Sequence, residues 1–265
     1  MTEQQPVLYA VDAGVATITL NRPEGMNGLT IATKEALLEA VTRAAEDAEV
    51  RCVVLTGTGR AFCVGQDLKE HVALLESGST DQLFTTVEKH YNPTVTALAE
   101  MPKPVIAAVN GVAAGAGASL AFACDLRVLA SSAGFNLAFP GVALSCDTGA
   151  SWTLPRLVGR AKAIELLYFP STIASADALE LGLATKVVPD DDLTAEVGAM
   201  AAKLAAGPTL SYASMRQSVS YSATHSFTES LAFEATKMNF TGASADHRRA
   251  VEAFLAKEKP TFEGR

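Results

Sequence analysis

The alternation of apolar and polar positions predicts short strands and helices that follow one another along the chain. Val7–Val11 and Val15–Leu20 flank the turn residues Asp12-Ala13-Gly14, a pattern typical of a β-hairpin. Thr33–Glu49 has the apolar spacing of a helix, and the apolar run Arg51–Thr56 after it predicts a strand. Because a helix separates the second and third strands, we expect these two to pair in parallel.

The longest uncharged run, Pro104–Cys124, begins like a strand, turns at Asn110-Gly111 and becomes helix-like behind Gly115 and Gly117. Glycine lets a backbone approach a ligand closely, and the free amides at a helix start favour negative charge. The run therefore predicts an anion cradle made of main-chain groups, although the same glycines could serve only close packing. Its length would also suffice to cross a membrane, but its proline, asparagine and many alanines favour a buried strand–turn–helix.

The middle of the chain continues the mixed order of elements. Residues 70–92 predict a polar loop that is broken by Gly78 and precedes a helix ending near Met101. Leu126–Ala130 and Ala184–Pro189 are strand-like.

Helical patterns dominate from Ala161 onward. The acidic triplet Asp190-Asp191-Asp192 could suggest a metal site, but we interpret it as the cap of a helix that starts near Leu193, since acidic residues favour helix N-termini. The expected organisation is a strand–helix core over residues 1–195 and a helical region over residues 196–265.

Composition narrows the possible functions. The 265 residues carry a net charge of −8, and the basic residues are scattered, which argues against a nucleic-acid partner. The four cysteines lack metal-type spacing, so buried thiols are expected rather than a disulfide framework or a metal site. The N-terminus has no secretory pattern, and we expect a cytoplasmic protein without membrane association.

A second glycine-punctuated segment, Gly57–Lys69, follows the predicted strand at Arg51–Thr56 and reads GTGRAFCVGQDLK. Together with Pro104–Gly117 it resembles the two hallmark motifs of the crotonase (enoyl-CoA hydratase/isomerase) superfamily. The segments Leu20–Asn27, Leu154–Gly159 and Ala253–Phe262 are also similar to family segments, in the family's order. The resemblance covers essentially the whole chain.

This resemblance implies an α/β fold: a crotonase-like spiral of ββα units with a helical C-terminal trimerisation region. It implies an acyl-CoA thioester as substrate and partner, with coenzyme A as part of the substrate and no tightly bound cofactor. It also implies a homotrimer or a dimer of trimers.

Carried over by motif, two main-chain amides would form an oxyanion hole for the thioester enolate, those of Gln66 and Ala116. Backbone donors do not depend on the side chain, and the loss of one such donor typically costs about 10²–10³ in rate. Gly65 is expected to form the turn, and Asp67 to order the loop or contact coenzyme A. Without the resemblance, Gly65 and Asp67 would both be interpreted as turn residues.

The acid/base groups distinguish the reactions of the superfamily. The two glutamates of family hydratases are replaced here by Ser119 and Phe139, which we expect to line the substrate pocket instead. Asp147 stands where the family's Δ3-Δ2-enoyl-CoA isomerases and its 1,2-epoxyphenylacetyl-CoA isomerase branch place a carboxylate. Its apolar neighbours, Leu144, Cys146 and Trp152, predict a raised pKa and a catalytic role. It could instead cap the helix entered at Gly149.

The resemblance therefore favours an isomerase that moves a double bond through an enolate, with Asp147 as its single acid/base. The alternatives are a hydratase with a non-standard site and a non-catalytic acyl-CoA-binding protein. A dehalogenase is disfavoured, because that branch has a tryptophan at Phe139 and a histidine in the helix before the cradle, where His90 fits only after a register shift. A Ser-His-Asp triad is also disfavoured, because none of the histidines lies in a nucleophile-elbow context.

Coenzyme A would be held by one group of residues between positions 24 and 69 and by one lysine near the end of the sequence. These residues are Glu24, Gly25, Met26, Val64, Gly65, Asp67, Lys69 and Lys257. Lys69 could pair with a phosphate, and Lys257 matches a family lysine that reaches the coenzyme A of a neighbouring subunit. Glu24 departs from the family, where a basic residue is common, and both lysines could equally be solvated surface charges.

Overall fold

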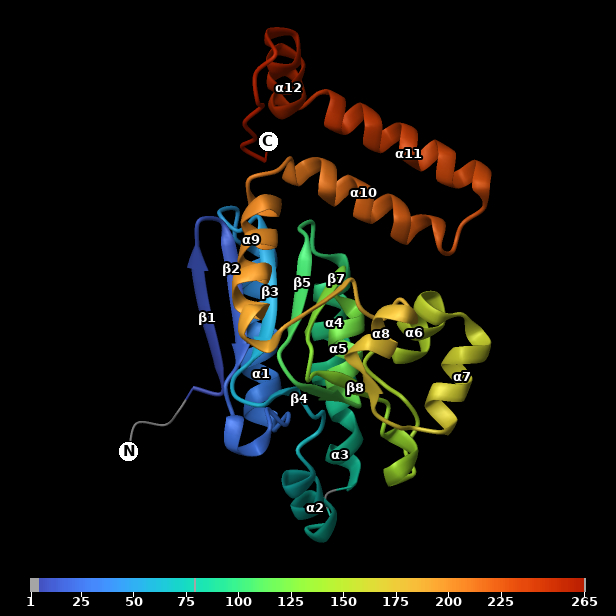
Figure 1. Ribbon diagram of the computed structural model, residues 1–265. Helices are drawn as coiled ribbons and strands as arrows, with labels where there is room; N and C mark the ends of the chain where they lie inside the picture. Colours follow the sequence, from blue (N-terminus) through green and yellow to red (C-terminus); the bar gives the residue numbers. More distant parts are fainter. Residues whose placement is uncertain (1–4, 79, 265) are drawn as a thin grey trace.

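A computed structural model describes residues 5–78 and 80–264 of the chain (Figure 1). Its larger sheet has six strands in the order β1-β2-β3-β5-β7-β10, formed by β1 (Val7–Asp12), β2 (Val15–Leu20), β3 (Cys52–Gly57), β5 (Val105–Val109), β7 (Leu126–Ala130) and β10 (Lys186–Val188). A four-stranded sheet has the order β4-β6-β8-β9, formed by β4 (Ala61–Cys63), β6 (Val112–Ala114), β8 (Gly134–Asn136) and β9 (Ile173–Ala174).

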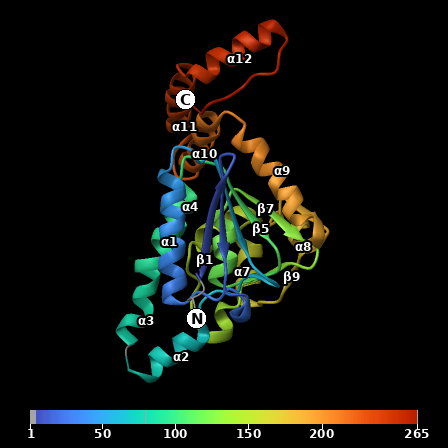
Figure 2. The same ribbon diagram turned by 90° about the vertical axis from the view of Figure 1, so that its left-hand side faces the viewer.

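The predicted hairpin and crossover are confirmed. Strands β1 and β2 are antiparallel with Val7 opposite Leu20, whereas β2 and β3 are parallel across helix α1 (Ile31–Glu46). The larger sheet lies between α1 on one face and α9 (Leu193–Ala205) on the other (Figure 2). Because both faces are covered, β3 and β5 are almost continuous apolar runs rather than alternating ones.

The loop predicted for residues 70–92 is wrong, because this segment is helical. It contains α2 (Leu68–Glu76), α3 (Thr80–Thr86) and a one-turn π-helix (Val87–Tyr91) that continues into α4 (Asn92–Glu100). No residue of α2 is buried, and Leu68, Val72 and Leu75 are exposed, so this helix lacks the buried apolar face that identifies a core helix. The helix predicted to end near Met101 is confirmed as α4.

The uncharged run folds as the buried strand–turn–helix that its composition favours. It forms β5, β6 and then α5 (Ala116–Ala123), in which every residue is buried. Across residues 5–78 and 80–264, no helix combines the length and the apolarity needed to span a bilayer.

Short helices complete the middle of the chain: α6 (Ala150–Val158), α7 (Arg160–Tyr168), α8 (Ser175–Glu180) and three 3₁₀ turns at Pro23–Gly25, Phe139–Val142 and Asp190–Asp192. Helix α9 begins at Leu193, as predicted, but Asp192 does not cap it with its side chain; instead Asp190 accepts a hydrogen bond from the Ser132 amide. All four cysteines are free, and three of them are buried.

The last three helices, α10 (Thr209–Ser222), α11 (Phe227–Gly242) and α12 (Ala245–Ala256), extend away from the sheets (Figure 1). Arg216 fastens α10 to the core, because its guanidinium pairs with Asp125 and donates to the carbonyls of Leu98 and Met101. A cavity of about 960 Å³ lies between α10 and the following helices and contains no residue of the predicted site. The division at residue 195 stays a prediction.

Candidate active site

The two glycine segments meet at the end of β4, against the start of α5. A Cβ at Gly65 would lie 2.9 Å from the carbonyl oxygen of Ala114 and 3.2 Å from the amide nitrogen of Ala116. Gly117 likewise lies directly against the carbonyl of Cys63. Glycine is needed at these positions because the two backbones touch, and Gly65 also has a left-handed φ of 82°.

The amides of Gln66 and Ala116 are both available at this junction. Within residues 5–78 and 80–264, neither N–H donates a hydrogen bond, although the neighbouring Leu29 and Asp67 amides do. Ala116 is the first residue of α5, where an amide has no partner in its own helix. The structure therefore brings together two unpartnered main-chain donors, the groups that an enolate oxygen would require.

The side chain of Gln66 is held by residues that the sequence analysis missed. Its Oε1 accepts hydrogen bonds from Lys34 Nζ at 2.9 Å and from Tyr91 Oη at 2.7 Å. Lys34 comes from α1 and Tyr91 from the π-helix, and both are buried. The ammonium of Lys34 also donates to Thr86, which in turn bonds His90.

Asp147 lies half-buried in the segment before α6, where burial raises its pKa despite a hydrogen bond from the Thr148 hydroxyl and the charge of Lys34. It does not cap α6: the N-cap is Gly149, and no side chain caps this helix. Of the apolar neighbours that the sequence suggested, Leu144 and Trp152 are exposed and Cys146 is half-buried. Burial, and after it the charge of Asp147, raises the pKa of the Tyr91 hydroxyl.

Ser119 and Phe139, which stand in place of carboxylates, are both buried beside the cradle. The Ser119 hydroxyl donates to the Gly115 carbonyl at 3.2 Å, so it serves its own helix. The Phe139 ring would be 3.9 Å from a Cβ at Gly115. A serine hydroxyl does not act as a base unaided and phenylalanine has no proton to exchange, and the role of both residues in the pocket stays a prediction.

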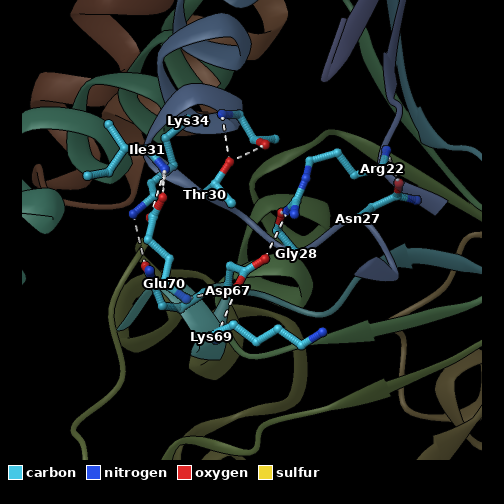
Figure 3. Close-up of polar contacts among 11 residues, drawn as sticks. Arg22, Asn27, Gly28, Thr30, Ile31, Lys34, Asp67, Lys69 and Glu70 are labelled. Carbon is cyan, nitrogen blue, oxygen red and sulfur yellow. Dashed lines mark hydrogen bonds and ion pairs between the residues drawn. The ribbon is translucent and has the colours of Figure 1, made fainter. Parts of the chain in front are cut away.

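The segments predicted to hold coenzyme A are tied together by polar contacts (Figure 3). Arg22 donates to the Gly28 carbonyl and pairs with Asp67 at 3.0 Å, and Asp67 accepts the Lys69 and Glu70 amides at the start of α2. Burial alone would raise the pKa of Asp67, but the Glu70 amide and the Arg22 guanidinium outweigh it and lower that pKa. Asp67 therefore orders the loop, as one of its two expected roles requires.

The remaining residues of this group are partly or fully exposed. Gly25 and Met26 are half-buried in and after the first 3₁₀ turn, Val64 donates its amide to the Met26 carbonyl, and Glu24 is exposed. The Lys69 side chain is exposed and extends away from Asp67 (Figure 3). These positions leave the coenzyme A contacts a prediction.

Lys257 lies elsewhere in this chain. It ends α12 with a left-handed φ of 58°, at the opposite end of the molecule from α2 (Figure 1). Its ammonium and that of Lys69 therefore do not share one site within a single chain, and its role toward coenzyme A stays a prediction.

The sequence carried only a weak signal for Lys34 and Tyr91. Lys34 occupies a position where the helical pattern expects an inward-facing residue, one turn before the buried Leu37. A lysine on an apolar face is unusual and could have been singled out on that ground. Tyr91 fell within the predicted loop, and its burial depends on the π turn, which sequence patterns do not indicate.

The junction thus presents two unpartnered main-chain amides, and the half-buried carboxylate of Asp147 interacts electrostatically with Lys34 and Tyr91, the two residues that hold the Gln66 side chain. The sequence matches the enoyl-CoA hydratase/isomerase family over residues 10–265. The chain belongs to this family and has the crotonase fold of its superfamily; it is an enzyme of that superfamily.

The similar proteins include one named as an isomerase and others named as hydratases. One, from Escherichia coli strain K12, is named 1,2-epoxyphenylacetyl-CoA isomerase and is 40% identical over 98% of either chain. Another, from Rhodobacter capsulatus and named "Probable enoyl-CoA hydratase", is 42% identical over 98% of either chain. A crystal structure of an enoyl-CoA hydratase from Bacillus anthracis superposes with a TM-score of 0.93 at 32% identity, covering 98% of this chain and 100% of the other.

Proposed function

We propose that the protein is an acyl-CoA isomerase that shifts a double bond from the β,γ to the α,β position of a coenzyme A thioester. The observation that carries this proposal is the half-buried carboxylate of Asp147, which accepts a hydrogen bond from the Thr148 hydroxyl and whose pKa burial raises. Ser119 and Phe139 occupy the positions of the hydratase glutamates, so no second carboxylate is supplied there to activate water. A relative named as an isomerase supports the same assignment.

One carboxylate is sufficient for the proposed reaction. Asp147 accepts a proton from the α-carbon, and the electron pair of that C–H bond moves onto the thioester oxygen, forming an enolate. The Gln66 and Ala116 amides would stabilise the negative charge with two preset hydrogen bonds. The protonated Asp147 then returns the proton to the γ-carbon while the double bond forms between the α- and β-carbons. No atom is gained or lost.

A raised pKa suits this role. The carboxylate must be ionised to accept the α-proton, and a higher pKa makes it a stronger base. The Thr148 hydroxyl and the charge of Lys34 limit the increase. The absence of a cap contact with α6 weakens the view that Asp147 serves only the helix.

A hydratase is the second candidate, because a relative at 42% identity is named as one. It would require Asp147 to activate water alone.

The direct assay follows formation of the conjugated 2-enoyl thioester from a 3-enoyl-CoA by ultraviolet absorbance, with crotonyl-CoA as the hydration control. We expect isomerisation without hydration. Hydration of crotonyl-CoA at a comparable rate would instead support the hydratase. Binding of both thioesters without turnover of either would contradict catalysis and support a binding protein.

Assembly into a trimer or a dimer of trimers is part of the proposal. The last three helices expose large apolar side chains, including Met215, Val219 and Phe254, which a further copy of the chain would cover. Such packing would also carry Lys257 toward the coenzyme A of the adjacent copy.

A further inference from the structure

Two buried donors converge on the side-chain oxygen of Gln66. Lys34 Nζ lies 2.9 Å and Tyr91 Oη 2.7 Å from Oε1, and the Lys34 ammonium lies 5.2 Å from the centre of the Tyr91 ring. An ammonium has three donors and no acceptor, so the atom that faces it is the oxygen of the amide and not its nitrogen. The orientation of this side chain is therefore fixed by chemistry.

The position of Lys34 is costly unless it serves a purpose. The residue is 2% exposed, and burial lowers the pKa of its ammonium. Among the side chains of residues 5–78 and 83–264, no carboxylate lies within ion-pair distance of it, and the charges of Glu70, Asp147 and Asp67 act on it only from further away. Its hydrogen-bond partners are the neutral side chains of Gln66 and Thr86. Buried charges are normally paired, so a lysine held by neutral partners has an explanation beyond stability.

The other side of Gln66 is fixed through the main chain. The Leu29 amide donates to the Gly65 carbonyl at 2.8 Å, and the Asp67 amide donates to the Leu29 carbonyl at 3.2 Å. These two hydrogen bonds surround Gln66 and leave its own N–H unpartnered. With its side chain held at Oε1 and both adjacent peptide groups bonded to Leu29, the direction of that N–H is restricted.

We propose that Lys34, together with Tyr91, is a positioning residue that aims the Gln66 amide at the substrate oxygen by holding the Gln66 side chain. The proposal rests on the proposed role of this amide in stabilising the enolate. Lys34 does not touch the reacting atoms; it acts through Gln66. Removing it would leave the amide present but less well directed, so the transition state would lose more stabilisation than the bound substrate.

A double-mutant cycle tests this dependence directly. The variants are Lys34→Met, Gln66→Met and the two combined, because methionine retains the length of either side chain without its hydrogen bonds. Isomerisation of a 3-enoyl-CoA gives kcat and KM, and infrared difference spectroscopy gives the carbonyl frequency of bound butyryl-CoA labelled with ¹³C at the thioester carbon. Butyryl-CoA has no double bond to move and so reports polarisation alone.

We expect either single variant to lower kcat about 10- to 100-fold with KM changed less than about threefold, a loss at or below that of deleting an oxyanion donor. The carbonyl band should move toward its frequency in free butyryl-CoA. The combined variant should lose no more than the more affected single variant, because residues that act through one another are not additive. Tyr91→Phe should show a smaller change of the same kind and remains informative if Lys34→Met does not fold.

Lys103→Met is the matched control. Lys103 is also a buried lysine, 6% exposed, but its ammonium donates to the Ala44 and Asp47 carbonyls at the end of α1. Its removal should lower stability and leave kcat and the carbonyl band unchanged.

Three results would overturn the proposal. One is a combined variant whose loss equals the product of the single losses; another is an unchanged carbonyl band in both Lys34→Met and Tyr91→Phe. The third is a change in the pH profile of kcat as the sole effect of Lys34→Met, which would show that its charge acts on Asp147 instead. The proposed reaction fails separately: wild-type protein that polarises the carbonyl but does not isomerise would contradict the reaction and leave the positioning role intact.

Discussion

Replacing Asp147 with asparagine should lower kcat for isomerisation by about 10²–10⁴-fold, the usual contribution of one general acid–base group. Asparagine retains the shape of the side chain and cannot accept the α-proton, so acyl-CoA binding should change little. The measurement is kcat by the ultraviolet assay, with the dissociation constant of a saturated acyl-CoA from calorimetry. Asp177→Asn, at an exposed aspartate of α8, is the control. Equal rates for wild type and Asp147→Asn would exclude Asp147 as the base.

The same substitution has a pH signature whose sign follows from the raised pKa. In the wild type, kcat should fall as Asp147 becomes protonated, at a pH above the ordinary aspartate pKa of about 3.9. A carboxyl whose pKa is higher in the folded state stabilises the fold below the unfolded pKa, and this contribution is lost as pH rises through the folded pKa. Asp147→Asn should therefore unfold at a higher temperature than wild type at neutral pH, and the difference should shrink below about pH 3.9. A difference that grows on acidification would contradict the raised pKa.

Gly65→Ala should lower kcat about 10²-fold or more, comparable with the loss of one oxyanion-hole donor. The new methyl group would lie 2.9 Å from the Ala114 carbonyl oxygen and 3.2 Å from the Ala116 nitrogen, which forces the two segments apart. The left-handed φ of 82° adds a conformational penalty of about 1–2 kcal/mol.

Gly159→Ala separates the two effects. Gly159 has a φ of 77°, and an added Cβ would have no atom within 4 Å. Both variants should lose stability from backbone strain, measured by chemical denaturation, but only Gly65→Ala should lose rate. A similar loss of kcat in Gly159→Ala would show that general destabilisation, rather than the junction, limits activity.

Much of this fold could be predicted from local patterns in the sequence. The hairpin at Asp12–Gly14 and the parallel strands β3 and β5 follow from apolar patterns and turn residues, which act over a few positions. The glycine cradle was also predictable, because Gly117 marks a close backbone approach and Gly115 adopts a positive φ of 50°, which favours glycine. What the patterns could not supply is the partner of each close approach: nothing local indicates that Gly117 packs on Cys63.

The parts that were missed depend on tertiary context. The π turn that delivers Tyr91 to Gln66 adds one residue to a helical turn, and no periodicity indicates such an insertion. The surroundings of Asp147 could not be predicted for a related reason, because its apolar sequence neighbours Leu144 and Trp152 are exposed. Its raised pKa was expected, and its largest cause is burial.

Thr148, directly after Asp147, affects both the proposed base and the stability of the fold. It is a buried, β-branched residue with a φ of 53°, a backbone region in which threonine is a genuine outlier. Glycine would relax this backbone, but it would remove the hydroxyl that donates to the Asp147 carboxylate at 2.9 Å. Selection for heat resistance alone would therefore favour glycine here, whereas selection for turnover would retain the strained threonine, because its hydroxyl holds the Asp147 carboxylate in place.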